Sequence, residues 1–206
     1  NEGRQAVADN RAGEGLISLR AALALDRRNP DYGLALASAL LTAGRSREAS
    51  SYLDRVLAER PTGGPANLTR ARAVRMLGDV DQATLYYRRA ADGTWPPGSA
   101  AQRVGVRFEM AEYLIGRSRL ADAGVALSEL RVSAPDDPAT RVRLARLLLM
   151  ARMPTDAADE LRALTATRAG DADVWSLLAR AEFDRGSDAG ARSAGRRALQ
   201  LHPDDA

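Results

Sequence analysis

Residues 77–90 read LGDVDQATLYYRRA, and the small residues of this stretch recur at a fixed distance along the chain. Gly78 follows Gly44 by thirty-four residues, and Ala83 follows Ala49 by the same number. Alanines and leucines in the second half of the chain are related in the same way. A fixed period of this length predicts a stacked repeat protein, which works by presenting a surface rather than by enclosing a catalytic pocket.

Each repeat is expected to be a hairpin of two antiparallel helices. In residues 30–63, Leu36 and Leu40 belong to the apolar stripe of a first helix, Gly44 interrupts that helix, and Leu53 belongs to the stripe of a second helix. Small residues such as Ala49 at the helix crossings allow the two backbones to approach closely. The sequence therefore predicts an all-α array.

The regular spacing breaks once, because Ala123 follows Ala83 by forty residues instead of thirty-four. The insertion is assigned to residues 92–99, DGTWPPGS, where two prolines and two glycines prevent a helix from continuing. We expect Trp95 to cover a gap between imperfectly stacked repeats, although an exposed anchor for a partner is the alternative. Gly116 lies two residues before the expected turn position, so that turn is expected to be distorted.

The period divides the chain into a single array with one insertion. The expected segments are a partial repeat at 1–29, repeats at 30–63 and 64–92, an insertion loop at 93–103, and repeats at 104–137, 138–171 and 172–206.

The composition fits a helical protein that binds other molecules. Of the 206 residues 45% are hydrophobic but only 4% aromatic, and all 30 basic residues are Arg, which suggests a bacterial genome rich in G and C. The net charge of +3 is weak support for an anionic partner. No apolar run is long enough to span a bilayer, so membrane insertion is not expected. The chain begins at Asn1, and we expect it to be cut from a longer one. The sequence therefore does not decide whether it lies in the cytoplasm or is the extracytoplasmic part of an anchored protein.

Residues that often carry chemistry have structural interpretations here. The single histidine, His202, lies near the end of the last helix, where the helix dipole accounts for it. The chain has no Cys, no phosphate-binding glycine loop and no metalloprotease motif, so we expect no catalytic activity, no cofactor and no metal. Three acidic pairs are expected to cap helices rather than to bind metal: Asp79/Asp81, Asp136/Asp137 and Asp171/Asp173.

The pattern resembles the tetratricopeptide repeat family. The last repeat carries the residues of that motif as Trp175, Leu178, Ala179, Gly186, Ala191, Ala198 and Pro203. Two departures are Arg152 at a turn that usually holds Gly, and Gly195 where the second helix usually has a large residue. The resemblance implies a right-handed superhelical solenoid of helix hairpins, with the first helix of each repeat lining a concave groove.

The resemblance also implies that a partner binds in this groove. Arg72, Arg146 and Arg180 occupy equivalent positions in three repeats, and guanidinium groups pair well with carboxylates. We therefore expect a protein-interaction scaffold that binds an acidic partner segment with apolar anchors. The candidate groove residues are Leu34, Ser38, Arg72, Arg75, Met76, Phe108, Glu112, Arg143, Arg146, Met150, Arg180 and Phe183.

Two further interactions stay open at the level of sequence. Binding of single-stranded nucleic acid is the alternative, disfavoured because only Phe108 and Phe183 offer aromatic rings in the groove. Weak self-association is expected if the ends of the array are uncapped. In that case Ala198, Leu199 and Leu201 would lie partly uncovered at one end, and Leu16 and Leu19 at the other.

Overall fold

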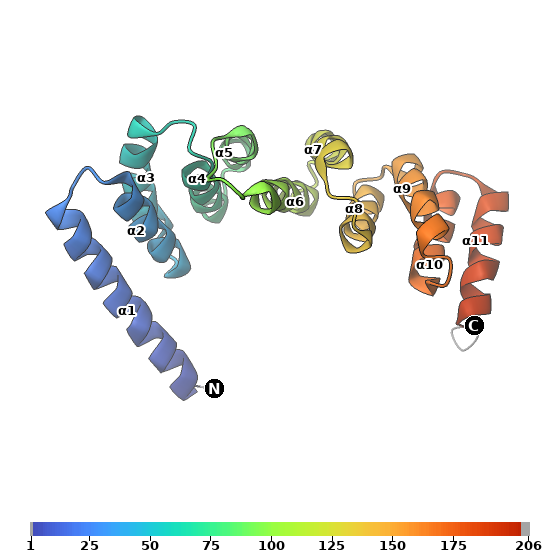
Figure 1. Ribbon diagram of the computed structural model, residues 1–206, viewed down its shortest axis with the longest axis horizontal. Helices are drawn as coiled ribbons and strands as arrows, with labels where there is room; N and C mark the ends of the chain where they lie inside the picture. Colours follow the sequence, from blue (N-terminus) through green and yellow to red (C-terminus); the bar gives the residue numbers. More distant parts are fainter. Residues whose placement is uncertain (1, 203–206) are drawn as a thin grey trace. The chain divides into compact units, whose positions relative to one another are not determined.

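The structure is a computed structural model that describes residues 2–202, with side chains described from Gly13 onward (Figure 1). Residues 2–202 contain no β-strand, only an isolated bridge between Gly63 and Thr94, and the predicted α solenoid is confirmed. The helices are α1 (Glu2–Leu25), α2 (Pro30–Thr42), α3 (Ser46–Glu59), α4 (Gly64–Leu77), α5 (Val80–Asp92), α6 (Ala100–Gly116), α7 (Leu120–Ser133), α8 (Pro138–Met150), α9 (Pro154–Thr167), α10 (Ala172–Asp184) and α11 (Asp188–Leu201).

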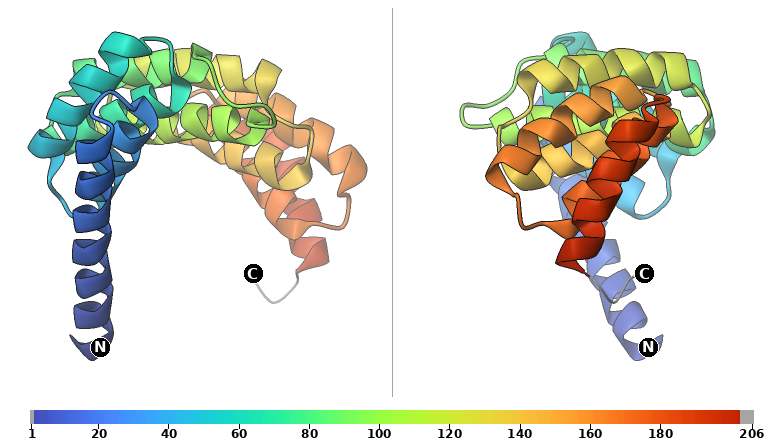
Figure 2. Two further views of the ribbon diagram at one scale, coloured as in Figure 1. Left: turned by 60° about the vertical axis from the view of Figure 1, so that its left-hand side comes forward. Right: turned by 90° about the vertical axis from the view of Figure 1, so that its right-hand side faces the viewer.

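The helices group into two compact units, residues 1–106 and residues 107–206. In the first unit α2 packs against α3, and α4 packs against α5, so that each pair forms a hairpin. In the second unit α8 packs against α9, and α10 packs against α11. The helix α1 precedes these hairpins and packs against α2 (Figure 2).

The core of the first unit is built from the apolar stripes that the sequence predicts. Leu36, Leu40 and Leu53 are fully buried, and Leu16 of α1 joins the same cluster with an exposed fraction of 6%. The expectation that Leu16 lies uncovered is therefore wrong, because α1 covers the first hairpin with this side of its C-terminal half. Leu19 is partly buried against the same cluster, as predicted.

The insertion forms a loop that is tied to the start of α4. Thr94 N donates to Thr62 O at 2.7 Å, and Gly64 N donates to Thr94 O at 2.8 Å. The indole Nε1 of Trp95 donates to Ala90 O at 2.7 Å, and its ring lies so close to Gly64 that a Cβ there would be 2.1 Å from Nε1. Trp95 thus packs within the first unit. The loop is shorter than the predicted 93–103, because α6 already begins at Ala100.

The turns between α2 and α3, α4 and α5, α6 and α7, α8 and α9, and α10 and α11, each of which joins the two helices of one hairpin, share one backbone conformation. Gly44, Gly78 and Gly186 have φ of 73°, 88° and 85°, and Ser118 and Arg152 adopt φ of 58° and 59° at the equivalent positions. In each turn the next residue's N–H bonds to a carbonyl five residues back, as Met153 N does to Leu148 O, which closes the end of the first helix. The turn near Gly116 is therefore regular in backbone but carries Ser instead of Gly at its left-handed position.

Side-chain caps are present at four helix starts, and three of them come from the acidic pairs predicted to cap helices. The side chain of Asn29 accepts from Asp31 N and Tyr32 N at the start of α2, with Pro30 in the first turn. The side chains of Asp79, Asp137 and Asp171 accept backbone N–H bonds at the starts of α5, α8 and α10.

The end of the last hairpin is only partly uncovered. Ala198 is 8% exposed, so the expectation that it lies uncovered is wrong, because α11 turns this residue toward α10. Leu199 is 46% exposed and Leu201 is partly buried. Pro203, predicted to close this repeat, lies outside the described residues, and self-association stays a prediction.

Candidate partner-binding face

The candidate groove residues of the first unit lie on the first helices of its two hairpins, which contact each other. On α2, Leu34 is partly buried and Ser38 is exposed; on α4, Arg72, Arg75 and Met76 are exposed. The thioether of Met76 accepts a hydrogen bond of 3.4 Å from the Ser46 hydroxyl, which links the end of α4 to the start of α3.

In the second unit the candidate residues lie on α6, α8 and α10. Three of them meet at one point. The guanidinium of Arg143 lies 4.3 Å from the centre of the Phe108 ring, and its Nη2 is 2.5 Å from Oε1 of Glu112. The Phe108 ring is only 3% exposed beneath this pair. The positive charge of Arg143 is therefore already matched within the chain, and Phe108 serves as the floor of an α6–α8 contact rather than as an open surface.

The remaining four candidates of the second unit form an open surface of mixed chemistry. Arg146 and Met150 are one helical turn apart on α8, and Arg180 and Phe183 are one turn apart on α10. Arg146 and Arg180 are separated by one repeat period, and α8 contacts α10, so the two pairs face the same way. We call these four residues the α8–α10 face.

The α8–α10 face is exposed and its charges are weakly compensated. Met150 is 58% exposed and Phe183 is 68% exposed, which is unusual for two large apolar side chains on neighbouring helices. Arg146 forms no ion pair with any residue that the structure describes. The side chain of Arg180 is 69% exposed, and its Nε is 3.7 Å from Asp184 on the same helix. The face can therefore offer two guanidinium groups and two adaptable apolar contacts to a ligand.

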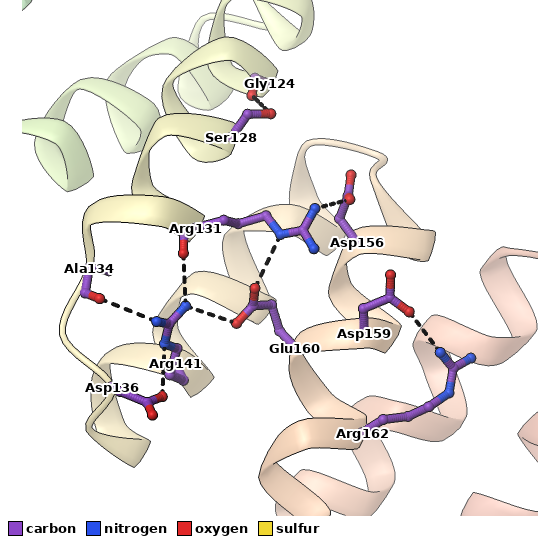
Figure 3. Close-up of polar contacts among 10 residues, drawn as sticks. All are labelled: Gly124, Ser128, Arg131, Ala134, Asp136, Arg141, Asp156, Asp159, Glu160 and Arg162. Carbon is purple, nitrogen blue, oxygen red and sulfur yellow. Dashed lines mark hydrogen bonds and ion pairs between the residues drawn. The ribbon is translucent and has the colours of Figure 1, made fainter.

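Sequence reasoning missed an ionic cluster that joins α7, α8 and α9 (Figure 3). Arg131 donates through Nε to Glu160 at 3.1 Å and pairs through Nη1 with Asp156. Arg141 donates through Nη1 to Glu160 at 3.2 Å and lies 3.4 Å from Asp136. Arg141 also donates to the carbonyls of Arg131 and Ala134 at the end of α7. The cluster fixes the turn between α7 and α8 and so holds α8, which carries Arg146 and Met150.

A second ionic cluster missed from the sequence surrounds Glu182, which is 3% exposed. Burial acts to raise the pKa of Glu182, but hydrogen bonds from Arg185, Ser187 and Arg162 outweigh it, so the pKa lies below its usual value. Gly190 permits this arrangement, because a Cβ there would be 2.4 Å from the carboxylate. The repeat period could have revealed this cluster, because the residues equivalent to Glu182 in the other four hairpins are all apolar: Leu40, Val74, Leu114 and Leu148.

No group of three or more His, Cys, Asp or Glu side chains placed to hold a metal ion was found among the described residues. None of the helices within residues 2–202 is long and apolar enough to cross a membrane.

Comparisons with known proteins agree with this architecture. Two family models described as tetratricopeptide repeat match residues 34–99 and 114–181. No curated protein sequence gives a significant match.

Several solved structures share the fold at low sequence identity. YrrB, described as a TPR protein with an unusual peptide-binding site, is 14% identical over 90% of this chain and 93% of its own, with a TM-score of 0.63. The C-terminal part of a TPR repeat-containing protein from Cytophaga hutchinsonii is 12% identical over 94% of this chain and 75% of its own, with a TM-score of 0.68. The pilF protein of Pseudomonas aeruginosa is 17% identical over 98% of this chain and 89% of its own, with a TM-score of 0.59.

Proposed function

The chain belongs to the tetratricopeptide repeat family, and on that premise we propose that it is a non-catalytic scaffold whose α8–α10 face binds an acidic segment of a partner protein. Proteins of this family generally act as interaction scaffolds. The observation that carries the proposal is the pairing of Arg146 and Arg180, one repeat apart, with the exposed Met150 and Phe183. The fold of a protein described as having a peptide-binding site supports it.

The chemistry of the α8–α10 face defines the ligand. Two carboxylates, spaced to reach neighbouring helices, would pair with Arg146 and Arg180, and one or two apolar side chains between them would cover Met150 and Phe183. An extended acidic segment with interspersed apolar residues meets both requirements.

Nucleic-acid binding is the weaker candidate for this face. Binding of single strands relies on several aromatic rings on which bases stack. Phe108 is buried under Arg143, so Phe183 is the one exposed aromatic residue among the candidates of the second unit. The face therefore suits carboxylates and apolar side chains better than bases.

Selection from a random peptide library tests the proposal. Peptides retained by the protein should be enriched in Asp and Glu together with at least one large apolar residue. The variant R146A/R180A should retain fewer of these peptides than the wild type, whereas R27A/R47A, which removes two exposed arginines of the first unit, should retain as many as the wild type. An absence of acidic enrichment, or equal recovery on the first variant, would refute the proposal.

A further inference from the structure

The last hairpin carries a second concentration of positive charge, away from the α8–α10 face. A shallow hollow between α10 and α11 is lined by Trp175, Arg192, Ser193, Arg196, Arg197 and Gln200, which we call the arginine patch. Trp175 and Arg180 are five residues apart on α10, so their side chains point about 140° apart around the helix axis. The patch and the α8–α10 face are therefore different surfaces.

The charge of the arginine patch is not neutralised by any residue of the second unit up to His202, where the described part of the chain ends. None of the residues that line the hollow is acidic. Arg192 and Arg196 form no ion pair with any part of the chain that the structure describes, and Arg197 donates only to the Gln200 side chain at 3.3 Å. Most guanidinium groups of the second unit, by contrast, have a carboxylate partner, as Arg131, Arg141 and Arg162 do.

The preceding hairpin has a hollow that shares two positions with this one, and its guanidinium group is paired with a carboxylate. One period before Trp175 lies Arg141, whose guanidinium is held by Glu160 at 3.2 Å (Figure 3). In the last hairpin Ala194 stands in the place of Glu160, and Arg197 stands in the place of Ala163. The last hairpin therefore has no carboxylate at the position of Glu160, and its guanidinium group at these positions lies on the second helix instead of the first.

Stacking of repeats accounts for only part of the patch. The residue equivalent to Arg192 in α9 is Ala158, which is fully buried. The residues equivalent to Ser193, Arg196, Arg197 and Gln200 are Asp159, Arg162, Ala163 and Ala166, and all four are exposed although α10 packs against α9 and Glu182 of α10 pairs with Arg162. The positions of Arg196 and Arg197 thus stay exposed even when another hairpin follows. Figure 2 shows α11 as the outermost helix of the second unit in the right-hand view.

Trp175 supplies the apolar part of the patch. Its indole Nε1 donates to Ala169 O at 2.9 Å, which holds the ring in place beside the arginines. A fixed indole next to guanidinium groups is the combination that dominates binding energy at many protein interfaces. A single aromatic ring offers too little stacking surface for a run of bases.

We propose that the arginine patch is a second binding site, which takes an acidic segment of a partner protein through charge complementarity with Arg192, Arg196 and Arg197. Carboxylates of the segment pair with these guanidinium groups, and a neighbouring apolar side chain covers the Trp175 ring.

The two tryptophans of the chain make this proposal testable residue by residue. A blocked twelve-residue peptide of Glu with two Leu residues is titrated into ¹⁵N-labelled protein, and the two indole signals are followed by NMR. The variant W95F assigns them. The Trp175 signal should shift and saturate, whereas the Trp95 signal, which belongs to the first unit, should not move.

Charge-reversal variants separate the patch from other basic surfaces. R196E/R197E should weaken the Trp175 response about tenfold, since two exposed ion pairs become repulsive. R27E/R47E, which changes the net charge equally, should keep the affinity within about twofold. R146E/R180E should leave the Trp175 response in place, so failure of the α8–α10 face and failure of the patch are distinguishable. Circular dichroism confirms that each variant is folded.

Three outcomes would overturn the proposal. The first is a Trp175 signal that does not respond to the peptide, and the second is a response that R196E/R197E leaves unchanged. The third concerns a twelve-nucleotide strand of thymidine, measured at the same salt concentration as the peptide. If this strand shifts the Trp175 signal at a lower concentration than the peptide does, the patch is assigned to nucleic acid.

Discussion

Arg162 on α9 donates through Nη2 a hydrogen bond of 2.5 Å to Oε1 of the buried Glu182 on α10. The pair joins two consecutive hairpins at a position where the other hairpins place an apolar core residue. Because α10 carries Arg180 and Phe183, the contact also fixes half of the α8–α10 face.

The first prediction concerns the pH dependence of this contact. The pKa of Glu182 in the folded protein lies below its usual value, so the ionised carboxylate stabilises the fold above about pH 4.5, and this contribution is lost as the pH falls through the folded pKa. The variant E182Q should be less stable than the wild type by about 1–2 kcal/mol at pH 7. Urea unfolding between pH 7 and pH 3 should show this difference shrinking.

The control for E182Q is D173N, which removes an exposed carboxylate from the same helix. It should follow the wild-type profile of stability against pH. A constant difference between E182Q and the wild type across this range would show that the charge of Glu182 does not stabilise the contact.

The second prediction concerns Arg152, which adopts φ of 59° where Gly186 has φ of 85° in the next hairpin. A left-handed backbone costs a residue with a side chain about 1 kcal/mol. R152G should therefore raise the free energy of unfolding by about 0.5–1 kcal/mol, after allowance for the larger entropy of Gly in the unfolded chain. Chemical denaturation measures the change.

The opposite exchange, G186A, should lower the stability by a similar amount, because it introduces the same strain. If R152G is destabilising, side-chain contacts of Arg152 outweigh the backbone cost, and the explanation given for this turn is wrong.

The third prediction concerns the contact between the insertion loop and α4. A Cβ at Gly64 would lie 2.1 Å from Nε1 of Trp95, so G64A should displace the indole and destabilise the first unit by about 1–3 kcal/mol. Trp95 fluorescence in a W175F background should shift to the red. G105A is the matched control in α6, since nothing lies within 4 Å of its Cβ, and it should leave that emission unchanged. A G64A variant with wild-type emission and stability would show that Trp95 does not pack there.

Most of the fold follows from the sequence because its determinants are local. The period, the apolar stripes and caps such as Asn29 and Asp137 each lie within one hairpin, and each has one dominant physical interpretation. The sequence predicts a longer insertion loop than the structure has, because the period and not a local helix start placed its end. Ser99 and Gln102 have the spacing of a capping box directly before α6 and indicate the shorter loop. The burial of Leu16 was missed because it depends on how α1 meets α2 and α3.

The candidate site was harder to predict from the sequence than the fold, because it depends on contacts between helices. The period places Phe108, Glu112 and Arg143 on the first helices of their hairpins. Whether an arginine on such a helix can bind a ligand depends on whether a side chain of a neighbouring helix already pairs with its guanidinium group. Arg143 contacts both Glu112 and the Phe108 ring, whereas Arg146, one turn further along α8, forms no ion pair with the described residues. Sequence alone gives these two arginines the same role.

The most direct test of the account is whether Met150 responds to an acidic ligand. The chain has four methionines, and Met110 is 2% exposed while Met150 is 58% exposed, so labelled methyl groups report on distinct places. The Glu/Leu peptide is titrated into ¹³C-methyl-methionine protein that carries R196E/R197E. We expect a saturable shift of the Met150 signal, no shift for Met110, and an affinity about fivefold weaker after addition of R146A/R180A. A Met150 signal that does not move, or that moves equally with and without these arginines, would contradict the account.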